Sequence, residues 1–401
     1  MKTLKQLITQ YGNPDAVSVK YNSTEKNYAI WGIEESVYID KNGLYLNDKI
    51  IDGDELNSLQ KILDNWKQTE NIISAIGFIS YDMKTILYKH IKFNTIKSNL
   101  PYLWFGKPKI IHEFSLEKHK FKPSISLKEI KSLPKIKQYI SDIKKIKTYL
   151  KNGDVYQINY TQPIHYTTSN DNFNLFSELI NLSHPEFGYY INTNHGSIIS
   201  LSPERLIHKQ GNIISSFPIK GTSPRSSNSH QDLIYKNELI NSNKDKAEHL
   251  MIVDLVRNDL GKICEFGTVK TDNLFGITTH ETVYHMESKI SGCLKNNINE
   301  IEIIKAIFPG GSITGAPKES AMKIIDKLEN YERGIYTGST GIIFNNGDMD
   351  FNINIRTLHC VKNKITYPVG GGIVWDSTPE GERNEAIQKG IILKTYSEHT
   401  I

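Results

Sequence analysis

Short β-patterned segments recur in pairs along the second half of the chain, and longer helical segments separate the pairs. The strand-like segments are rich in alternating apolar residues and are bounded by Gly, Asn and Asp. Hairpin-like strand pairs mixed with helices favour an α+β fold over a doubly wound parallel sheet. The expected strands are residues 198–201, 338–344, 349–357 and 364–369, and the expected helices are residues 232–242, 245–260, 318–328 and 380–396.

The chain divides near Pro134 into two regions of different pattern. Residues 1–135 are predicted to form a β-rich region, with strand patterns at 28–33, 37–39 and 44–46. After Pro134, apolar residues recur at helical spacing from Tyr139 to Leu150, Gly153 is placed to end that helix, and a strand pattern follows. Residues 136–401 are therefore predicted to form a second region of mixed helices and strands against which the N-terminal region packs, and the candidate catalytic residues all lie in it.

Composition excludes several classes of protein. Lys and Arg number 48 against 44 for Asp and Glu, a surplus too small to indicate a nucleic-acid partner. The longest apolar runs, such as residues 72–79, fall short of the ~20 residues of a membrane-spanning helix. The N-terminal residues lack the pattern of a secretory signal, so a cytoplasmic protein is expected. The three cysteines lie outside any CxxC pattern, which predicts neither a disulfide framework nor a structural zinc site.

Two predicted helices carry carboxylates that could bind a cation. Glu248 falls on the apolar stripe of residues 245–260, and burying an ionised Glu is costly unless it is paired or binds a cation. Glu382, Glu385 and Lys389 share one face of the last helix. Mg²⁺ takes carboxylate ligands, whereas zinc would require His or Cys. Considered separately, a Glu favoured by the helix dipole and an exposed ion-pair face remain alternative interpretations.

Two glycine-rich segments and three charged residues are further candidates. Residues 308–322 run into a helix whose N–H groups could hold an anion, but Ala-Pro stands where a Walker loop has Gly-Lys. Gly370 to Gly372 could let a ligand carboxylate approach the backbone, although a bulge or tight bend is the default interpretation of such a run. Arg356 would project from a strand opposite Ile353 and Ile355, either toward a carboxylate or toward solvent. Glu204 and Lys220 are candidates for an acid and a nucleophile.

Taken in order, nine motifs resemble the chorismate-utilising enzymes over roughly residues 150 to 395. That family includes anthranilate, aminodeoxychorismate, isochorismate and salicylate synthases. A weaker resemblance lies in SAIGFISYDM, residues 74–83. The motifs are GDVYQINYTQ, SPER, PIKGT, DKAEHLMIVDLVRNDLG, GGSITGAPKESAM, YTGSTG, INIRTL, GGGIVWDS and EGERNEAIQK.

The resemblance implies two large antiparallel sheets packed together and flanked by helices, with the site between them. It implies that Glu248 and Glu385, with Glu382 nearby, hold Mg²⁺ against the ring carboxylate of chorismate. Lys220 and Glu204 are the implied catalytic residues. The implied substrate-binding residues are Gln157, Thr222, His285, Thr314, Tyr336, Arg356, Gly370, Gly371, Gly372 and Lys389.

Two positions indicate which reaction of the family to expect. Lys220 stands where anthranilate synthases have Ala, and Lys is typical of aminodeoxychorismate synthases. Gln157 stands where isochorismate and salicylate synthases place the lysine that activates water. The resemblance therefore implies amination of chorismate to 4-amino-4-deoxychorismate, on the route to para-aminobenzoate and folate, with anthranilate synthesis as the nearest alternative and isochorismate or salicylate synthesis further off.

The source of nitrogen is expected to lie outside this chain. None of the cysteines has the GxCxG setting of a glutaminase, and residue 2 is Lys2. Free ammonia, or a separate glutamine amidotransferase subunit, must then supply the amino group. No clear LLES-like segment is present in the N-terminal region, so tryptophan binding there is not predicted.

Overall fold

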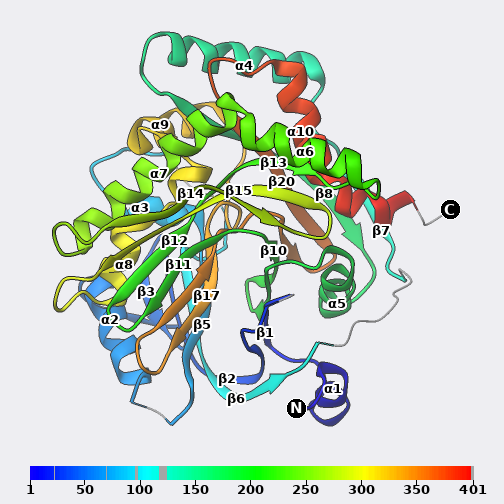
Figure 1. Cartoon of the computed structure of the whole chain (residues 1–401). Helices are drawn as coiled ribbons and strands as arrows, with labels where there is room; N and C mark the ends of the chain where they lie inside the picture. The colour runs from blue at the N-terminus through cyan, green and yellow to red at the C-terminus, as the bar shows by residue number, and fades with distance from the viewer. Residues whose placement is uncertain (22, 69, 95–97, 117–123, 399–401) are drawn as a thin grey trace.

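The computed structural model describes residues 1–401 apart from 22, 69, 95–97, 117–123 and 399–401 (Figure 1). The helices are α1 (Leu4–Tyr11), α2 (Glu55–Trp66), α3 (Lys84–Leu87), α4 (Ile136–Lys151), α5 (Asn172–Ser183), α6 (Ser229–Asn241), α7 (Asn243–Ile263), α8 (Glu300–Ile307), α9 (Lys318–Leu328) and α10 (Pro379–Glu398), with 3-10 turns η1 (Tyr81–Met83) and η2 (Gly311–Ile313). The first strands are β1 (Ala16–Val19), β2 (Asn27–Asp40), β3 (Gly43–Leu46), β4 (Lys49–Ile51), β5 (Ile73–Ile79), β6 (Leu103–Phe114) and β7 (Leu127–Lys131). The later strands are β8 (Gln157–Thr168), β9 (Phe187–Thr193), β10 (Gly196–Ser202), β11 (Arg205–Gln210), β12 (Ile213–Phe217), β13 (Ile219–Pro224), β14 (Lys270–Thr279), β15 (Val283–Cys293), β16 (Gly315–Ala316), β17 (Ser339–Phe344), β18 (Met349–Asn352), β19 (Thr357–Val361) and β20 (Lys364–Ile373).

The α+β fold is confirmed, with a large antiparallel sheet flanked by helices (Figure 1). Hydrogen bonds join the strands of the expected sheets into one closed network. The ladder between β8 and β20 runs unbroken from Lys364 opposite Thr167 to Ile373 opposite Ile158. This ladder brings the glycine run of β20 beside the start of β8.

Two local predictions are wrong. Residues 349–357 do not form one strand: β18 ends at Asn352, β19 begins at Thr357, and Arg356 between them has a left-handed backbone with φ of 51°. Arg356 therefore does not alternate with Ile353 and Ile355 along a strand. The glycine run is not a bulge, because Gly370, Gly371 and Gly372 keep regular antiparallel register with β8.

Helices cover the network according to their apolar faces. α4 and α10 lie side by side at the top of the view in Figure 1, and α10 packs on β20. Tyr139, Ile143 and Ile146 of α4 are buried, as their helical spacing predicts. α7 packs against β13 and β15, which places Glu248 above the strand that carries Lys220.

The N-terminal region is hydrogen-bonded into the same network. β5 pairs with β17 and β1 pairs with β9, so strands from the two sides of Pro134 are hydrogen-bonded to each other. One buried core combines Leu59 and Phe105 with Ile304 and Phe351. A division into residues 1–135 and 136–401 stays a prediction. None of the helices in the described ranges is long and apolar enough to cross a lipid bilayer.

Candidate active site

The ends of the Lys220 and Gln157 side chains both lie close to the backbone of Gly372. A methyl group added at Gly372 would lie 3.0 Å from Lys220 Nζ and 3.1 Å from Gln157 Nε2. Gln157 is fully buried, and within the described part of the chain neither its Nε2 nor its Oε1 has a hydrogen-bond partner. A buried amide without partners is costly, so this side chain is suited to a polar ligand that supplies both a donor and an acceptor.

Glu204 is a buried acid on the connection from β10 to β11. Its side chain is 4% exposed, and its Oε1 accepts a hydrogen bond of 2.8 Å from Ser312 Oγ. Burial raises the pKa of Glu204 to about 7, although the Ser312 hydroxyl and the Lys220 ammonium both act to lower that pKa. A carboxyl group that holds its proton near neutral pH can act as a general acid.

Lys220 lies on β13, and burial lowers the pKa of its amine. Glu248 is the charge with the largest opposing effect, and Lys389 lowers the pKa of the amine further. A lysine with a lowered pKa is more often neutral at physiological pH, and only the neutral amine is a nucleophile. The sequence alone could not establish this lowered pKa, because the pKa depends on the burial of Lys220 in the folded structure.

The three predicted metal ligands come from two helices, and two of them, Glu382 and Glu385, lie close to Gly371 of β20. A methyl group added at Gly371 would lie 3.2 Å from Glu385 Oε1 and 3.4 Å from Glu382 Oε2. Burial raises the pKa of Glu248, and Glu382 adds to that rise. Burial also raises the pKa of Glu382, and Glu385 adds to that rise. Glu385 is half-exposed and its Oε1 accepts a 2.6 Å bond from Lys389 Nζ. Burial alone would raise the pKa of Glu385, but Lys389 holds it below its usual range.

The donor chemistry of these acids suits a hard divalent cation. All three are carboxylates, and Glu382 Oε2 is buried without a hydrogen-bond partner in the described ranges. In this arrangement, however, no group of three or more His, Cys, Asp or Glu among the described residues is placed to ligate a metal. Mg²⁺ binding by Glu248, Glu382 and Glu385 therefore stays a prediction, to which a substrate carboxylate would have to add a ligand.

Three other predicted substrate residues form a second group around a neighbouring cavity. His285 and Arg356 both line a cavity of about 860 Å³ that also contains Glu287. Thr222, which is exposed, lies opposite His285 in the β13–β15 ladder, and its Oγ1 is 2.9 Å from His285 Nδ1. Burial lowers the pKa of His285 to about 3, with His280 and Arg356 adding to the effect. His285 is thus a neutral imidazole at physiological pH.

The remaining predicted residues support the walls of the site. Thr314 is fully buried, and its Oγ1 donates to Gly310 O at 2.7 Å. Tyr336 is buried, and burial raises the pKa of its hydroxyl above the usual range. Lys389 Nζ donates to Gly370 O at 2.9 Å, which ties α10 to β20.

Sequence reasoning missed Ser312 as a functional residue. It lies inside the GGSITG motif, but its role depends on a contact with Glu204, a residue 108 positions earlier in the chain. Position within a motif is the one signal that could have singled it out. A hydroxyl group beside a predicted acid is otherwise invisible in a single sequence.

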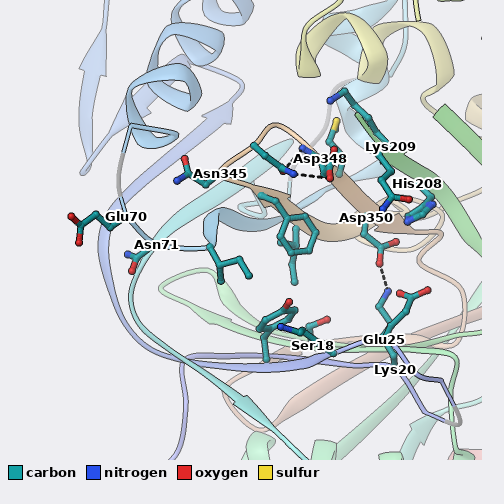
Figure 2. A pocket seen from close by; sticks show the side chains of 18 residues that line it. Ser18, Lys20, Glu25, Glu70, Asn71, His208, Lys209, Asn345, Asp348 and Asp350 are labelled. Carbon is teal, nitrogen blue, oxygen red and sulfur yellow. Dashed lines mark hydrogen bonds and ion pairs between the residues drawn. The ribbon is translucent and has the colours of Figure 1, made fainter. Parts of the chain in front are cut away.

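A further cavity of about 900 Å³ shares Lys20 and Glu25 with the cavity that His285 lines (Figure 2). Its polar lining includes Lys20 and Asp350, whose Nζ and Oδ2 are 2.5 Å apart in the ion pair drawn in Figure 2. Arg205 Nε contacts the other Asp350 oxygen at 3.0 Å. None of the predicted site residues lines this cavity.

The chain belongs to the chorismate binding enzyme family, whose model matches residues 115–395. Among its relatives, anthranilate synthase component 1 of Saccharolobus solfataricus is 36% identical over 80% of this chain and 79% of that protein. Aminodeoxychorismate synthase component 1 of Escherichia coli is 42% identical over 63% of this chain and 56% of that protein. The match thus spans little more than half of the latter relative's length.

The fold is that of solved members of this group. The crystal structure of anthranilate synthase component I from Streptococcus pneumoniae superposes with a TM-score of 0.80 at 23% identity, covering 94% of this chain and 93% of that one. At this identity the likeness concerns the fold.

Proposed function

We propose that the protein aminates chorismate at C4 to give 4-amino-4-deoxychorismate, the precursor of para-aminobenzoate on the route to folate. The observation that carries this proposal is the position of the Lys220 amine, 3.0 Å from a methyl group built on Gly372 and beside the Gln157 amide, which has no hydrogen-bond partner in the part of the chain that the structure describes. The E. coli relative named aminodeoxychorismate synthase component 1 supports the same activity.

The first step is addition of lysine to the ring. The neutral Lys220 amine attacks C2, the two ring double bonds shift toward C4, and the C4–O bond breaks. Glu204, whose pKa is raised to about 7 by burial, gives its proton to the departing hydroxyl group, which leaves as water. The product of this step is a secondary ammonium between Lys220 and C2.

The second step is displacement of lysine by ammonia. Ammonia attacks C4, the double bonds shift back, and the C2–N bond breaks. Lys220 leaves as a neutral amine and the new C4 nitrogen carries the proton as an ammonium. Two successive displacements return the configuration at C4, and pyruvate is retained because no free 2-amino or 2-hydroxy intermediate is released from Lys220. Solvent then reprotonates Glu204.

The two carboxylates of chorismate are proposed to be held by two different groups of residues. Glu248, Glu382 and Glu385 would hold Mg²⁺, which when bound supplies a positive charge to the ring carboxylate. The amides of Gly371 and Gly372, with Arg356 and Tyr336, are proposed to hold the enolpyruvyl carboxylate. Neutral His285, Thr222, Thr314 and Lys389 complete the proposed pocket.

The nitrogen donor is proposed to be a separate glutamine amidotransferase subunit, with free ammonia as a substitute in the test tube. The printed name "component 1" of the E. coli relative supports a second component. A cytoplasmic location is proposed on the grounds given by the sequence.

Anthranilate synthesis is the rival reaction, favoured by the 36% identity to the Saccharolobus protein over 80% of the chain. Incubation of the purified protein with chorismate, Mg²⁺ and an ammonium salt, followed by mass analysis of the products, separates the two. Aminodeoxychorismate without pyruvate is the expected result. Anthranilate with pyruvate would establish anthranilate synthesis instead. Isochorismate or salicylate would show that the enzyme adds water to chorismate. Bound but unchanged chorismate would show a subunit that binds chorismate without catalysing a reaction.

A further inference from the structure

We propose that Arg333, held by Glu329, is a positioning residue that ties together the three backbone segments carrying Gln157, Thr314 and Tyr336. The inference rests on the proposed function, because it concerns the geometry of the chorismate pocket. The Arg333 and Glu329 side chains are 1% and 2% exposed. Removing two charges from water is costly, so a pair buried this deeply must be compensated by well-formed hydrogen bonds.

The planar guanidinium group of Arg333 donates hydrogen bonds in two directions. Toward Glu329, Arg333 Nε donates to Oε2 at 2.8 Å and Nη2 donates to Oε1 at 2.7 Å. Away from Glu329, Nη2 donates to Asn159 O at 2.6 Å, while Nη1 donates to Ile313 O at 3.0 Å and to Thr337 Oγ1 at 3.2 Å. One side chain therefore contacts three segments that are far apart in the sequence.

Each of these three contacts adjoins a proposed substrate residue. Ile313 precedes Thr314 in the GGSITG segment, and Thr337 follows Tyr336. Asn159 lies two residues after Gln157 on β8, so the two side chains project from the same face of the strand. Arg333 thus lies behind the walls of the pocket and acts through its neighbours.

Direct bonds between the segments add to this arrangement. Asn159 N donates to Thr314 O at 3.0 Å, and Asn159 Nδ2 donates to Ile313 O at 3.0 Å. Thr337 has a left-handed backbone with φ of 61°, an unfavourable conformation for a β-branched residue. The hydrogen bond from Arg333 to the Thr337 hydroxyl helps to hold that conformation, and with it the direction of Tyr336.

Glu329 also makes contacts of its own with β8. Its Oε1 also accepts hydrogen bonds from Thr161 N at 2.9 Å and Thr161 Oγ1 at 2.8 Å. The carboxylate therefore links the guanidinium group to a second point on β8. A lysine in place of Arg333 would keep the charge but could not donate along the two sides of a planar fork.

The test compares Arg333→Lys and Glu329→Gln with the control Glu300→Gln. Glu300 is 4% exposed and binds Gln60 Nε2 at 2.7 Å and Lys67 Nζ at 2.9 Å, linking α2 to α8. None of the proposed site residues belongs to that group. Chorismate affinity is measured by calorimetric titration in the presence of Mg²⁺, and stability by thermal unfolding.

Glu329→Gln and Glu300→Gln are both expected to lower the unfolding temperature, because each removes the charge of a buried carboxylate that is paired with a cation. Only Arg333→Lys and Glu329→Gln are expected to weaken chorismate binding, by about tenfold or more. Unchanged affinity in the folded variants, or an equal loss in Glu300→Gln, would overturn the proposal. If Arg333→Lys does not fold, the comparison of the two glutamine variants decides. If the wild-type protein binds chorismate but forms another product, the proposed function is wrong. The test of Arg333 remains valid in that case, because the test measures chorismate binding and not product formation.

Discussion

Lys220 carries the proposed reaction because its amine is buried beside the glycine strand and its pKa is lowered by that burial. Lys220→Ala should retain chorismate affinity within about threefold, while aminodeoxychorismate formation falls on the order of 100-fold or more, since the variant cannot form the covalent adduct. Steady-state rates and binding titrations check both quantities. The exposed Lys323 on α9 provides the control variant Lys323→Ala. Wild-type rates in Lys220→Ala at saturating ammonia would remove the covalent role.

Glu248 is the proposed cation ligand from α7. Glu248→Gln keeps the size of the side chain and removes its charge, so the Mg²⁺ concentration for half-maximal activity should rise by about tenfold or more. A Mg²⁺ titration of the rate measures this concentration. Glu238→Gln changes an exposed glutamate of α6 and should leave the titration unchanged. If both variants match the wild type, Glu248 is not a ligand.

The hydrogen bond from Ser312 should affect the pH dependence of the reaction through Glu204. Burial raises the pKa of Glu204 to about 7, and the Ser312 hydroxyl acts in the opposite direction. Because Glu204 must be protonated to act as an acid, the rate should fall as the pH rises through about 7. Ser312→Ala removes the opposing bond, so this fall should move to higher pH, by about one pH unit for a bond of ~1.4 kcal/mol.

The Ser312 experiment measures kcat/KM against pH at a constant concentration of free ammonia, since ammonia itself titrates. Ser312→Thr keeps a hydroxyl group and is expected to retain the wild-type profile. A profile that does not move in Ser312→Ala, or that moves to lower pH, would separate Ser312 from the acid.

At the scale of the element, Gly370 and Gly372 of β20 lie against different kinds of neighbouring atom. A methyl group at Gly370 would lie 2.1 Å from Tyr160 O, a backbone atom that cannot move aside. At Gly372 the nearest atoms are the ends of two side chains, Lys220 at 3.0 Å and Gln157 at 3.1 Å. The ladder with β8 produces the contact at Gly370, whereas Lys220 reaches Gly372 from β13.

Two alanine variants of β20 should therefore fail in different ways. Gly370→Ala is expected to destabilise the protein by about 1–3 kcal/mol, the usual cost of overpacking. Gly372→Ala should unfold within about 1 kcal/mol of the wild type but lose tenfold or more in kcat/KM, because the methyl group displaces Lys220. Urea denaturation and steady-state kinetics measure the two effects. Equal stability and equal activity in both variants would contradict the described packing of this strand.

At the scale of the whole molecule, the strands of both predicted regions form one hydrogen-bonded network with a shared core. Unfolding is therefore expected to be a single cooperative transition. Three of the four tryptophans, Trp31, Trp66 and Trp104, lie before Pro134, so fluorescence follows that region, while circular dichroism follows the entire chain. Coincident urea transitions are the expected result. Two separated transitions would instead support residues 1–135 as a unit that unfolds independently.

Local patterns in the sequence determined the secondary structure and the kinds of side chain available for chemistry. α9 has the predicted bounds Lys318–Leu328, and α10 carries Glu382 and Glu385 near its start as expected. Such features depend on residues within one or two helical turns, and a single sequence displays that range directly.

Only the tertiary structure decided how those side chains are used. It left the Gln157 amide without a hydrogen-bond partner among the described residues, placed Ser312 against Glu204, and gave Arg356 a left-handed backbone between two strands. It also buried Glu382 while leaving Glu385 half-exposed and paired with Lys389. The physical reason is that burial, pKa and hydrogen bonding depend on strands and helices that pair across a hundred residues or more, and the period of one element does not specify its partner.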